Sequence, residues 1–170
     1  MSNLRLINET TASSSASISV TDVFTTDFDI YKIVTNQKGI SSETSIEGRF
    51  INTSGSIISS SNYDYARQML KSWTSFGEDY STNQNRFRSF GEAGTQGASS
   101  VSYVFNPMNS SSYTFFLNQN AGSPAGGNFN MKGIAVLKLT NQISGINFFP
   151  DSGNAFTSFD CKIYGLRVDS

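Results

Sequence analysis

The sequence predicts an all-β protein, an antiparallel β-sandwich of about eight to ten short strands with at most one short helix. Three observations support this prediction. Apolar side chains recur at every second position along most of the chain, which is the period of a half-buried strand. Clusters of Gly, Pro, Asn and Ser separate these runs at near-regular intervals. The 14 Phe and 7 Tyr residues suit the faces of a pleated sheet.

Each expected strand is an alternating run bounded by turn residues, and the segments between them are expected loops. The hairpin signal is clearest where residues 106–109 (NPMN) separate two clean alternations. We expect loops at residues 10–15 and 122–127, and a polar, glycine-rich stretch with one weak strand and a mobile loop at 77–100. The alternating runs from which these strands are expected are residues 4–6, 16–20, 28–35, 45–52, 56–59, 85–90, 101–105, 113–117, 133–140, 143–149 and 159–168.

The segment 63–73 fits two structures. Tyr65, Met69 and Trp73 lie four residues apart, which is the spacing of one helix face. Tyr63, Tyr65, Arg67 and Met69 also alternate as a strand would present them. Because the surrounding sequence is β throughout, we favour the strand.

Length and composition predict one domain, residues 1–170, with a full hydrophobic core. Charged residues make up only 15% of the chain and the net charge is -1, so binding to nucleic acid through phosphate neutralisation is not expected. The N-terminus has no signal-peptide pattern, and no apolar run approaches the roughly 20 residues of a membrane span. We therefore expect that the protein neither binds nucleic acid nor inserts into a membrane.

Catalytic and metal chemistry is not expected, because the sequence contains no His. Imidazole bases, Ser-His-Asp relays and the common zinc sites therefore cannot form. The single Cys161 lies in an alternating run and is predicted to be a small buried hydrophobe. We expect no catalytic residue, no cofactor and no metal ligand.

One group of carboxylates leaves an alternative open. Asp22, Asp27 and Asp29 lie close together, and the last two would share a strand face, so a calcium site or a glycosidase acid pair fits the spacing. The simpler interpretation is that they mark the entrance of a strand and its solvent face. No spaced loop of oxygen ligands of the EF-hand type accompanies them, which favours the simpler interpretation.

The aromatic side chains that flank the polar, glycine-rich stretch are the first place to look for a ligand surface. Exposed rings could stack on sugars, although most of these rings are expected in the core. Arg86 and Arg88, on either side of Phe87, are expected on a solvated strand face. The candidate contact residues are Tyr63, Tyr65, Trp73, Tyr80, Arg86 and Arg88.

Both ends of the chain resemble a known group of proteins. Residues 4–13 (LRLINETTAS), 18–24 (ISVTDVF) and 28–33 (FDIYKI) resemble the start of many bacteriophage virion proteins, particularly of marine and cyanobacterial phages. Residues 143–149 (ISGINFF), 153–156 (GNAF) and 162–166 (KIYGL) look like their usual ending. The middle, from about residue 39 to 127, has no such likeness. The resemblance implies a jelly-roll-like sandwich that often trimerises, and it transfers no catalytic residue.

Two functions fit this resemblance. The recognisable domain nearly fills the sequence and leaves no shaft or added segment, which favours a capsid decoration (cement) protein on the outside of a phage head. Its expected partners are itself, as a homotrimer, and the major capsid protein or another virion protein, in a virion made in the host cytoplasm. The alternative is a receptor-binding knob of a tail or head fibre that contacts host surface glycan or protein. A carboxylate-based polysaccharide hydrolase is the third candidate.

Overall fold

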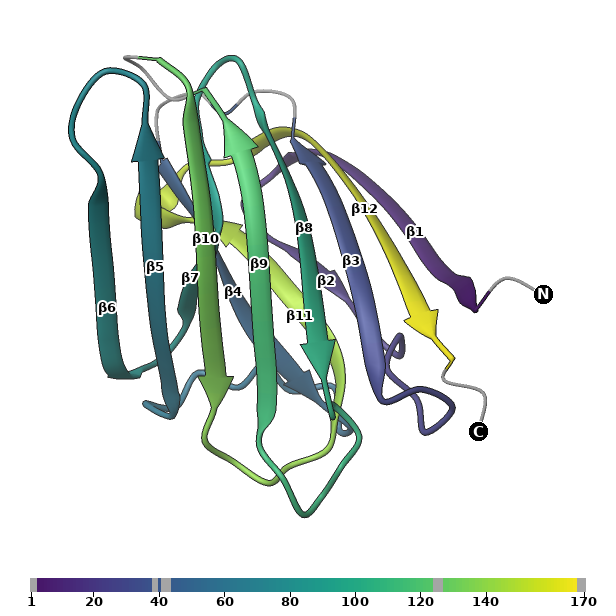
Figure 1. Cartoon of the computed structure of the whole chain (residues 1–170). Helices are drawn as coiled ribbons and strands as arrows, with labels where there is room; N and C mark the ends of the chain where they lie inside the picture. Colours follow the sequence, from purple (N-terminus) through teal and green to yellow (C-terminus); the bar gives the residue numbers. More distant parts are fainter. Residues whose placement is uncertain (1–2, 38–39, 41–43, 124–126, 168–170) are drawn as a thin grey trace.

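The structure, a computed structural model of the chain, is a sandwich of two antiparallel sheets and describes residues 3–37, 40, 44–123 and 127–167. Figure 1 shows the eight-stranded sheet in front of the four-stranded sheet. The described residues contain twelve strands, one 3-10 turn (η1, Asp151–Gly153) and no α-helix. The strands are β1 (Leu4–Ser15), β2 (Ile18–Val20), β3 (Ile30–Gln37), β4 (Thr44–Asn52), β5 (Tyr63–Lys71), β6 (Gly77–Gln84), β7 (Phe87–Ala93), β8 (Ala98–Phe105), β9 (Thr114–Gly122), β10 (Phe129–Leu137), β11 (Ile143–Pro150) and β12 (Phe156–Leu166).

The strand order is that of a jelly roll with one added hairpin. The large sheet runs β1-β12-β3-β8-β9-β10-β5-β6 and the small sheet runs β2-β11-β4-β7. The pairs β5·β6, β4·β7, β3·β8, β2·β11 and β1·β12 are nested inside one another along the chain. A single antiparallel ribbon, rolled over so that its pairs fall alternately in the two sheets, gives this order, and the hairpin β9–β10 is inserted between β8 and β5. The predicted all-β, jelly-roll-like sandwich is confirmed.

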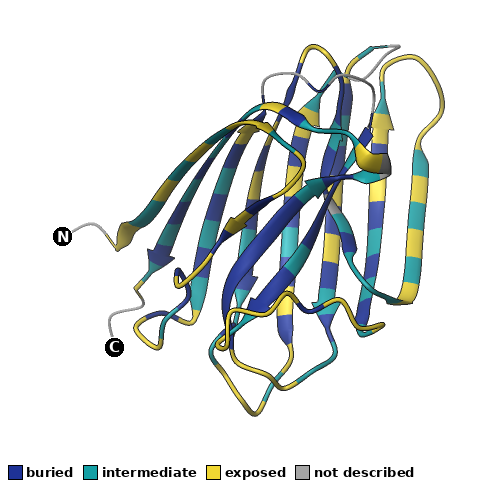
Figure 2. Ribbon diagram, turned by 180° about the vertical axis from the view of Figure 1, so that it is seen from behind, coloured by how far each residue is buried: buried dark blue, intermediate teal, exposed yellow. Residues whose placement is uncertain are grey.

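Period-two alternation positions the side chains as the sequence predicts. β5 and β8 alternate between buried and more exposed residues along their length, which Figure 2 shows as colour bands. β11 is different, because seven of its eight residues are buried. The loop after β2 covers part of it, since Val23 and Phe24 donate backbone hydrogen bonds to the Ser144 carbonyl oxygen at 2.9 and 3.1 Å.

Aromatic rings fill the space between the sheets. Phe87 contacts Phe50, Tyr63, Phe90 and Phe116, with ring centroids 4.9–5.6 Å apart. Edge-on and tilted contacts of this kind are the favourable geometries for aromatic pairs. These rings come from β4, β5, β7 and β9, so the cluster joins the two sheets.

Two glycines permit this close packing. A Cβ atom on Gly165 would lie 2.5 Å from the ring of Phe28, so the glycine at this position in β12 lets the ring pack directly against the backbone. A Cβ atom on Gly48 would lie 2.6 Å from Phe90 and 2.7 Å from Phe87. Neither position has room for a side chain without moving a core ring.

Several sequence predictions are settled by these strands. Residues 63–71 form strand β5, as favoured, and the hairpin around residues 106–109 joins β8 to β9. The number of strands exceeds the predicted eight to ten. Residues 56–59 form no strand and contribute only an isolated bridge between Ile51 and Ile57.

Two expected loops are wrong. Residues 10–15 belong to β1, because this Ser/Thr-rich segment is an edge strand whose hydrogen bonds go to β12. Residues 77–100 hold β6, β7 and the start of β8 instead of one weak strand and a mobile loop. Polar composition concealed both, since the residues of β6 are all at least partly exposed. Of the predicted turn at 122–127, residues 124–126 lie outside the described residues.

Candidate functional site

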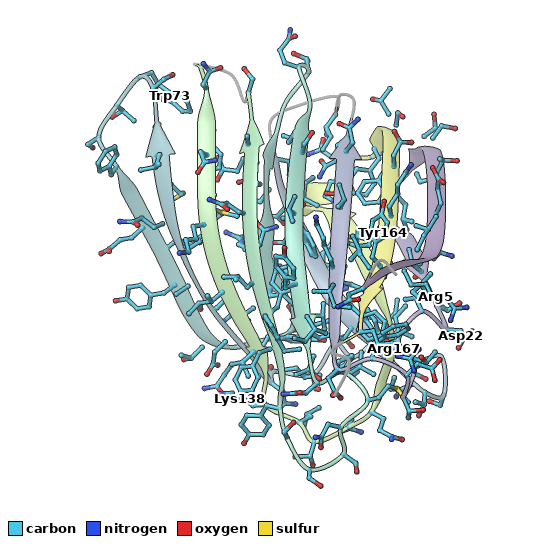
Figure 3. The ribbon with its side chains drawn as sticks, turned by 45° about the vertical axis from the view of Figure 1, so that its right-hand side comes forward. Arg5, Asp22, Trp73, Lys138, Tyr164 and Arg167 are labelled. Carbon is cyan, nitrogen blue, oxygen red and sulfur yellow. The ribbon has the colours of Figure 1, made fainter. Side chains whose placement is uncertain are left out.

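The six predicted contact residues do not form one site. Tyr63 and Tyr65 point into the core, with exposed fractions of 0% and 9%. Trp73 and Tyr80 are exposed, whereas Arg86 and Arg88 belong to the segment entering β7 in the other sheet. Figure 3 shows Trp73 beyond one end of β5, far from Lys138, which pairs with Asp64 near the other end. The prediction that most of these rings are core is confirmed for Tyr63, Tyr65, Phe87 and Phe90.

Tyr63 has a structural role. Its hydroxyl donates to the Ile58 carbonyl oxygen and accepts from the Phe50 amide, each at 3.0 Å. Burial raises the pKa of Tyr63 well above its usual value, although the Phe50 amide and Arg49 favour the charged form. The side chain fastens β5 to the end of β4, so it is not available to a ligand.

The outer side of the large sheet carries a continuous apolar surface, which we call the apolar face. The strand register places Tyr80, Ala66, Ile134, Leu117 and Tyr103 in one row across β6, β5, β10, β9 and β8. Ile134 is 56% exposed and Tyr80 is 74% exposed. A groove of about 650 Å³ lies along this face between β6 and β9. The apolar face consists of Ala66, Tyr80, Tyr103, Phe105, Phe115, Leu117, Ile134 and Val136.

Polar side chains border the apolar face on three of its strands. One step further along the sheet, Gln68, Lys132 and Gln119 lie side by side across β5, β10 and β9. All three are exposed. Polar side chains therefore border the apolar face on β5, β10 and β9, whereas on β8 the exposed Val101 lies beside Gln119, and Leu70 is exposed further along β5.

The outer side of the small sheet carries charges instead. Glu47 on β4 is only 1% exposed and lies between Arg86 and Arg88, whose Nε atoms pair with its two carboxylate oxygens. The Arg88–Glu47 pair is 2.8 Å long, and Arg88 Nη2 also donates to Asp151 Oδ2 at 3.0 Å. Burial lowers the pKa of Arg88, but the hydrogen bond and charge of Glu47 outweigh it, so the pKa lies above its ordinary value.

Arg49 completes this group, which we call the arginine cluster (Glu47, Arg49, Arg86, Arg88 and Asp151). Its guanidinium lies 4.5 Å from the ring centroid of Phe149, and its Nε donates to the Asn85 carbonyl oxygen at 3.0 Å. A pocket of about 400 Å³ is lined by Arg49, Arg86, Phe149 and Asp151 among others. Arg86 and Arg88 lie on the outer side of the small sheet and are partly exposed, but the predicted solvated face is also a paired one, because both guanidinium groups are bound to the buried carboxylate of Glu47.

The carboxylates predicted around residue 27 do not share a strand face. β3 begins at Ile30, so Asp22, Asp27 and Asp29 lie in the loop before it, and all three are exposed. Asp22 has a positive φ of 57°. Across the described ranges, no group of three His, Cys, Asp or Glu residues could hold a metal ion.

Cys161 is fully buried, as predicted for a small hydrophobe. Burial raises the pKa of its thiol from 9.0 to about 12, so the nucleophilic thiolate is scarce at neutral pH. In the part of the chain that the structure describes, no helix is long and apolar enough to span a bilayer.

Comparison with known proteins adds little to this geometry. No protein-family model matches the chain, and no curated protein does. A protein of unknown function from Shewanella oneidensis MR-1 aligns over 99% of this chain and 78% of its own, with 8% identity and a TM-score of 0.27. A chain of infectious bursal disease virus, Gx strain, aligns over 96% of this chain and 40% of its own, with 10% identity and a TM-score of 0.15. Likenesses this weak carry no argument about fold or function.

Sequence reasoning missed most residues of both surfaces. Glu47 and Arg49 were visible as an alternating charged pair on one strand face, and Arg86 and Arg88 as another. Opposite charges at period two on two strands indicate cross-strand pairing. On the apolar face, the consecutive apolar residues Phe115, Phe116 and Leu117 were the available signal, because a strand apolar on both faces reads as an unbroken run.

Proposed function

We propose that this protein is a non-enzymatic structural subunit of a bacteriophage virion, a capsid decoration protein that attaches through its apolar face. Its jelly-roll topology is the architecture of many viral capsid domains, although lectin domains share it. The resemblance of residues 4–33 and 143–166 to virion proteins supports the same assignment. The proposal requires no cofactor and no catalytic group.

The apolar face is the observation that carries the proposal. Antiparallel sheets usually leave one face solvated and polar, whereas strands covered on both faces are apolar throughout. Phe115 and Leu117 are on the outer side of β9 while Phe116, between them, is 2% exposed in the core. A large contiguous apolar surface on a folded domain marks an interaction site.

Attachment would follow from burying this surface against the capsid. The row from Tyr80 to Tyr103 supplies the apolar centre of a contact, and the groove of about 650 Å³ would receive a side chain or loop of the major capsid protein. Gln68, Gln119 and Lys132 then form a polar rim on one side. The homotrimer implied by the resemblance remains part of the proposal.

Capsids that lack the protein provide the test. Purified wild-type protein is added to such capsids of the phage that encodes it, and bound copies are counted by cosedimentation and electron cryomicroscopy. Ile134→Glu places a charge in the centre of the apolar face and should lower binding ten-fold or more. Ser13→Glu, at an exposed position of β1 on the far edge of the same sheet, is the matched control and should bind as wild type does.

The outcomes separate the partners. The proposed attachment would be refuted if wild-type protein does not bind the capsids. It would also be refuted if the Ile134→Glu variant binds them as wild type does. If Ile134→Glu instead dissolves an oligomer of the chain and capsid binding is unchanged, the apolar face joins copies to one another and the proposal is wrong on this point. Native mass spectrometry of both variants measures the oligomer.

A receptor-binding knob on a fibre is the second candidate. One observation favours it, the pocket beside Arg49. That pocket lies on the small sheet, away from the apolar face, so the two surfaces can be tested separately.

A further inference from the structure

We propose that the pocket beside Arg49 binds an acidic sugar, with the sugar carboxylate held by the Arg49 guanidinium. The site is built from β4, β11 and the η1 turn on the outer side of the small sheet. The proposed sugar site does not use the apolar face. It is therefore compatible with a head decoration protein and with a fibre tip alike.

Charge balance leaves Arg49 in excess. The carboxylates of Glu47 and Asp151 are paired with Arg86 and Arg88 at both of their oxygens. Three guanidinium groups and two carboxylates give the arginine cluster a net charge of +1. Among the described residues, Arg49 has no carboxylate within ion-pair distance, so it is the group that remains to bind an anion.

The guanidinium of Arg49 is held ready for a ligand. Phe149 supports it at 4.5 Å and the Asn85 carbonyl oxygen fixes its Nε at 3.0 Å. These two contacts use the Nε atom and one face of the guanidinium. They leave the two terminal nitrogens to bind a carboxylate in bidentate fashion. A side chain positioned before binding loses less conformational entropy when the ligand arrives.

The rest of the pocket favours a sugar over an acidic peptide. Asp151 is half-buried and lines the same pocket as Arg49. It offers only acceptor oxygens, which repel the second acidic side chain of a peptide but accept hydrogen bonds from the hydroxyl groups of a sugar. A uronic or sialic acid brings both a carboxylate and hydroxyl donors. Pro150 adds an apolar wall, and the volume of about 400 Å³ is within the range of small-molecule sites.

Titration with defined sugars tests the proposal. Galacturonic acid and N-acetylneuraminic acid are the acidic probes, galactose is the neutral control, and a tetraglutamate peptide is the competing acidic ligand. Binding is followed by isothermal calorimetry and by NMR shifts at Phe149. We expect at least one acidic sugar to bind, with an affinity that falls as sodium chloride rises.

Three variants locate the site. Arg49→Gln should weaken binding about ten-fold or more, because a charge-assisted bidentate pair is lost. Arg49→Lys retains the charge but not the fork and should weaken it several-fold. Arg5→Gln removes the same charge from β1 in the other sheet and should have no effect. Circular dichroism confirms that each variant is folded.

Three results would overturn the inference. The first is equal binding of galactose and the acidic sugars, and the second is an Arg49→Gln variant with unchanged affinity. The third is preferential binding of the tetraglutamate peptide, which would make this an acidic-peptide site. None of these depends on capsid binding, so failure here and failure of the decoration role are distinguishable.

Discussion

The two outer surfaces of the sandwich handle their exposed groups in opposite ways. On the large sheet, side chains of the apolar face such as Ile134 and Tyr80 are in contact with water, and none of the residues that the structure describes covers them. On the small sheet, the carboxylates of Glu47 and Asp151 form ion pairs with two arginines of the arginine cluster. The guanidinium of Arg49 is the third cation of the cluster and takes no part in these pairs. The comparison predicts that truncating the first surface costs the single chain little stability, whereas breaking the ion pairs of the second costs more.

Adjacent phenylalanines on β9 give the widest expected contrast. Phe116 packs on Phe87 and Phe90 at 4.9 Å, whereas Phe115 belongs to the apolar face and is 45% exposed. We expect Phe116→Ala to lower the free energy of unfolding by about 3–5 kcal/mol and Phe115→Ala by less than about 1 kcal/mol. Urea denaturation measures both. Similar losses for the two variants would contradict the register of β9. They would also contradict the prediction that the apolar face contributes little to the stability of the single chain.

Glu47 tests the stabilising side of the comparison. Glu47→Gln keeps the size of the side chain but leaves Arg86 and Arg88 without their buried partner. Both arginines are partly exposed, so we expect a loss of about 2–3 kcal/mol, below the range for fully buried pairs. Glu9→Gln is the control, since its pair with Lys162 is exposed and should contribute nothing measurable. Equal midpoints in urea would mean that the cluster does not stabilise the chain.

Alkaline pH tests the interior of the sandwich, and between pH 9 and 10 its expected effect on stability is the smallest of the three. Burial raises the pKa of Cys161 from 9.0 to about 12, so the unfolded chain loses this proton first. Stability is therefore fully present below pH 9 and falls by up to about 1.4 kcal/mol per pH unit between 9 and 12. Tyr63, whose pKa burial also raises, adds a loss above pH 10.

Cys161→Ala isolates the thiol contribution. Between pH 9 and 10 the variant should lose stability more slowly than wild type, by one proton in the slope of unfolding free energy against pH. An unchanged slope would assign the alkaline loss to charged groups on the surface instead.

The sequence predicts most of the fold because alternation is a local property. Val101, Tyr103 and Phe105 alternate within one strand, and so does the β5 segment from Tyr63, once the β context decides against a helix. The second half of β1 and all of β6 escaped prediction because edge strands rich in Ser, Thr and Asn satisfy their backbone by pairing, with little apolar burial to reveal them. Local patterns therefore identify strands that bury an apolar side better than polar edge strands.

The sites were far less accessible to sequence reasoning. Glu47 meets Arg88 across 41 residues, and Arg88 meets Asp151 across 63, so the arginine cluster exists only once β4, β7 and η1 are packed. The apolar face fails for another reason. When Phe115, Phe116 and Leu117 are all apolar, alternation cannot say which of them faces the core, and the register of β9 must decide.

The nested ribbon also has a consequence for synthesis. β5 and β6 are adjacent in the chain, while β1 must wait for β12, where Leu4 pairs with Leu166. Contacts between such distant residues carry the largest loop-closure entropy and favour slow folding. The first four strands leave the ribosome before β7, β8, β11 or β12 can pair with them. Chaperones that hold unpaired strands apart therefore have the most to do during the first half of translation.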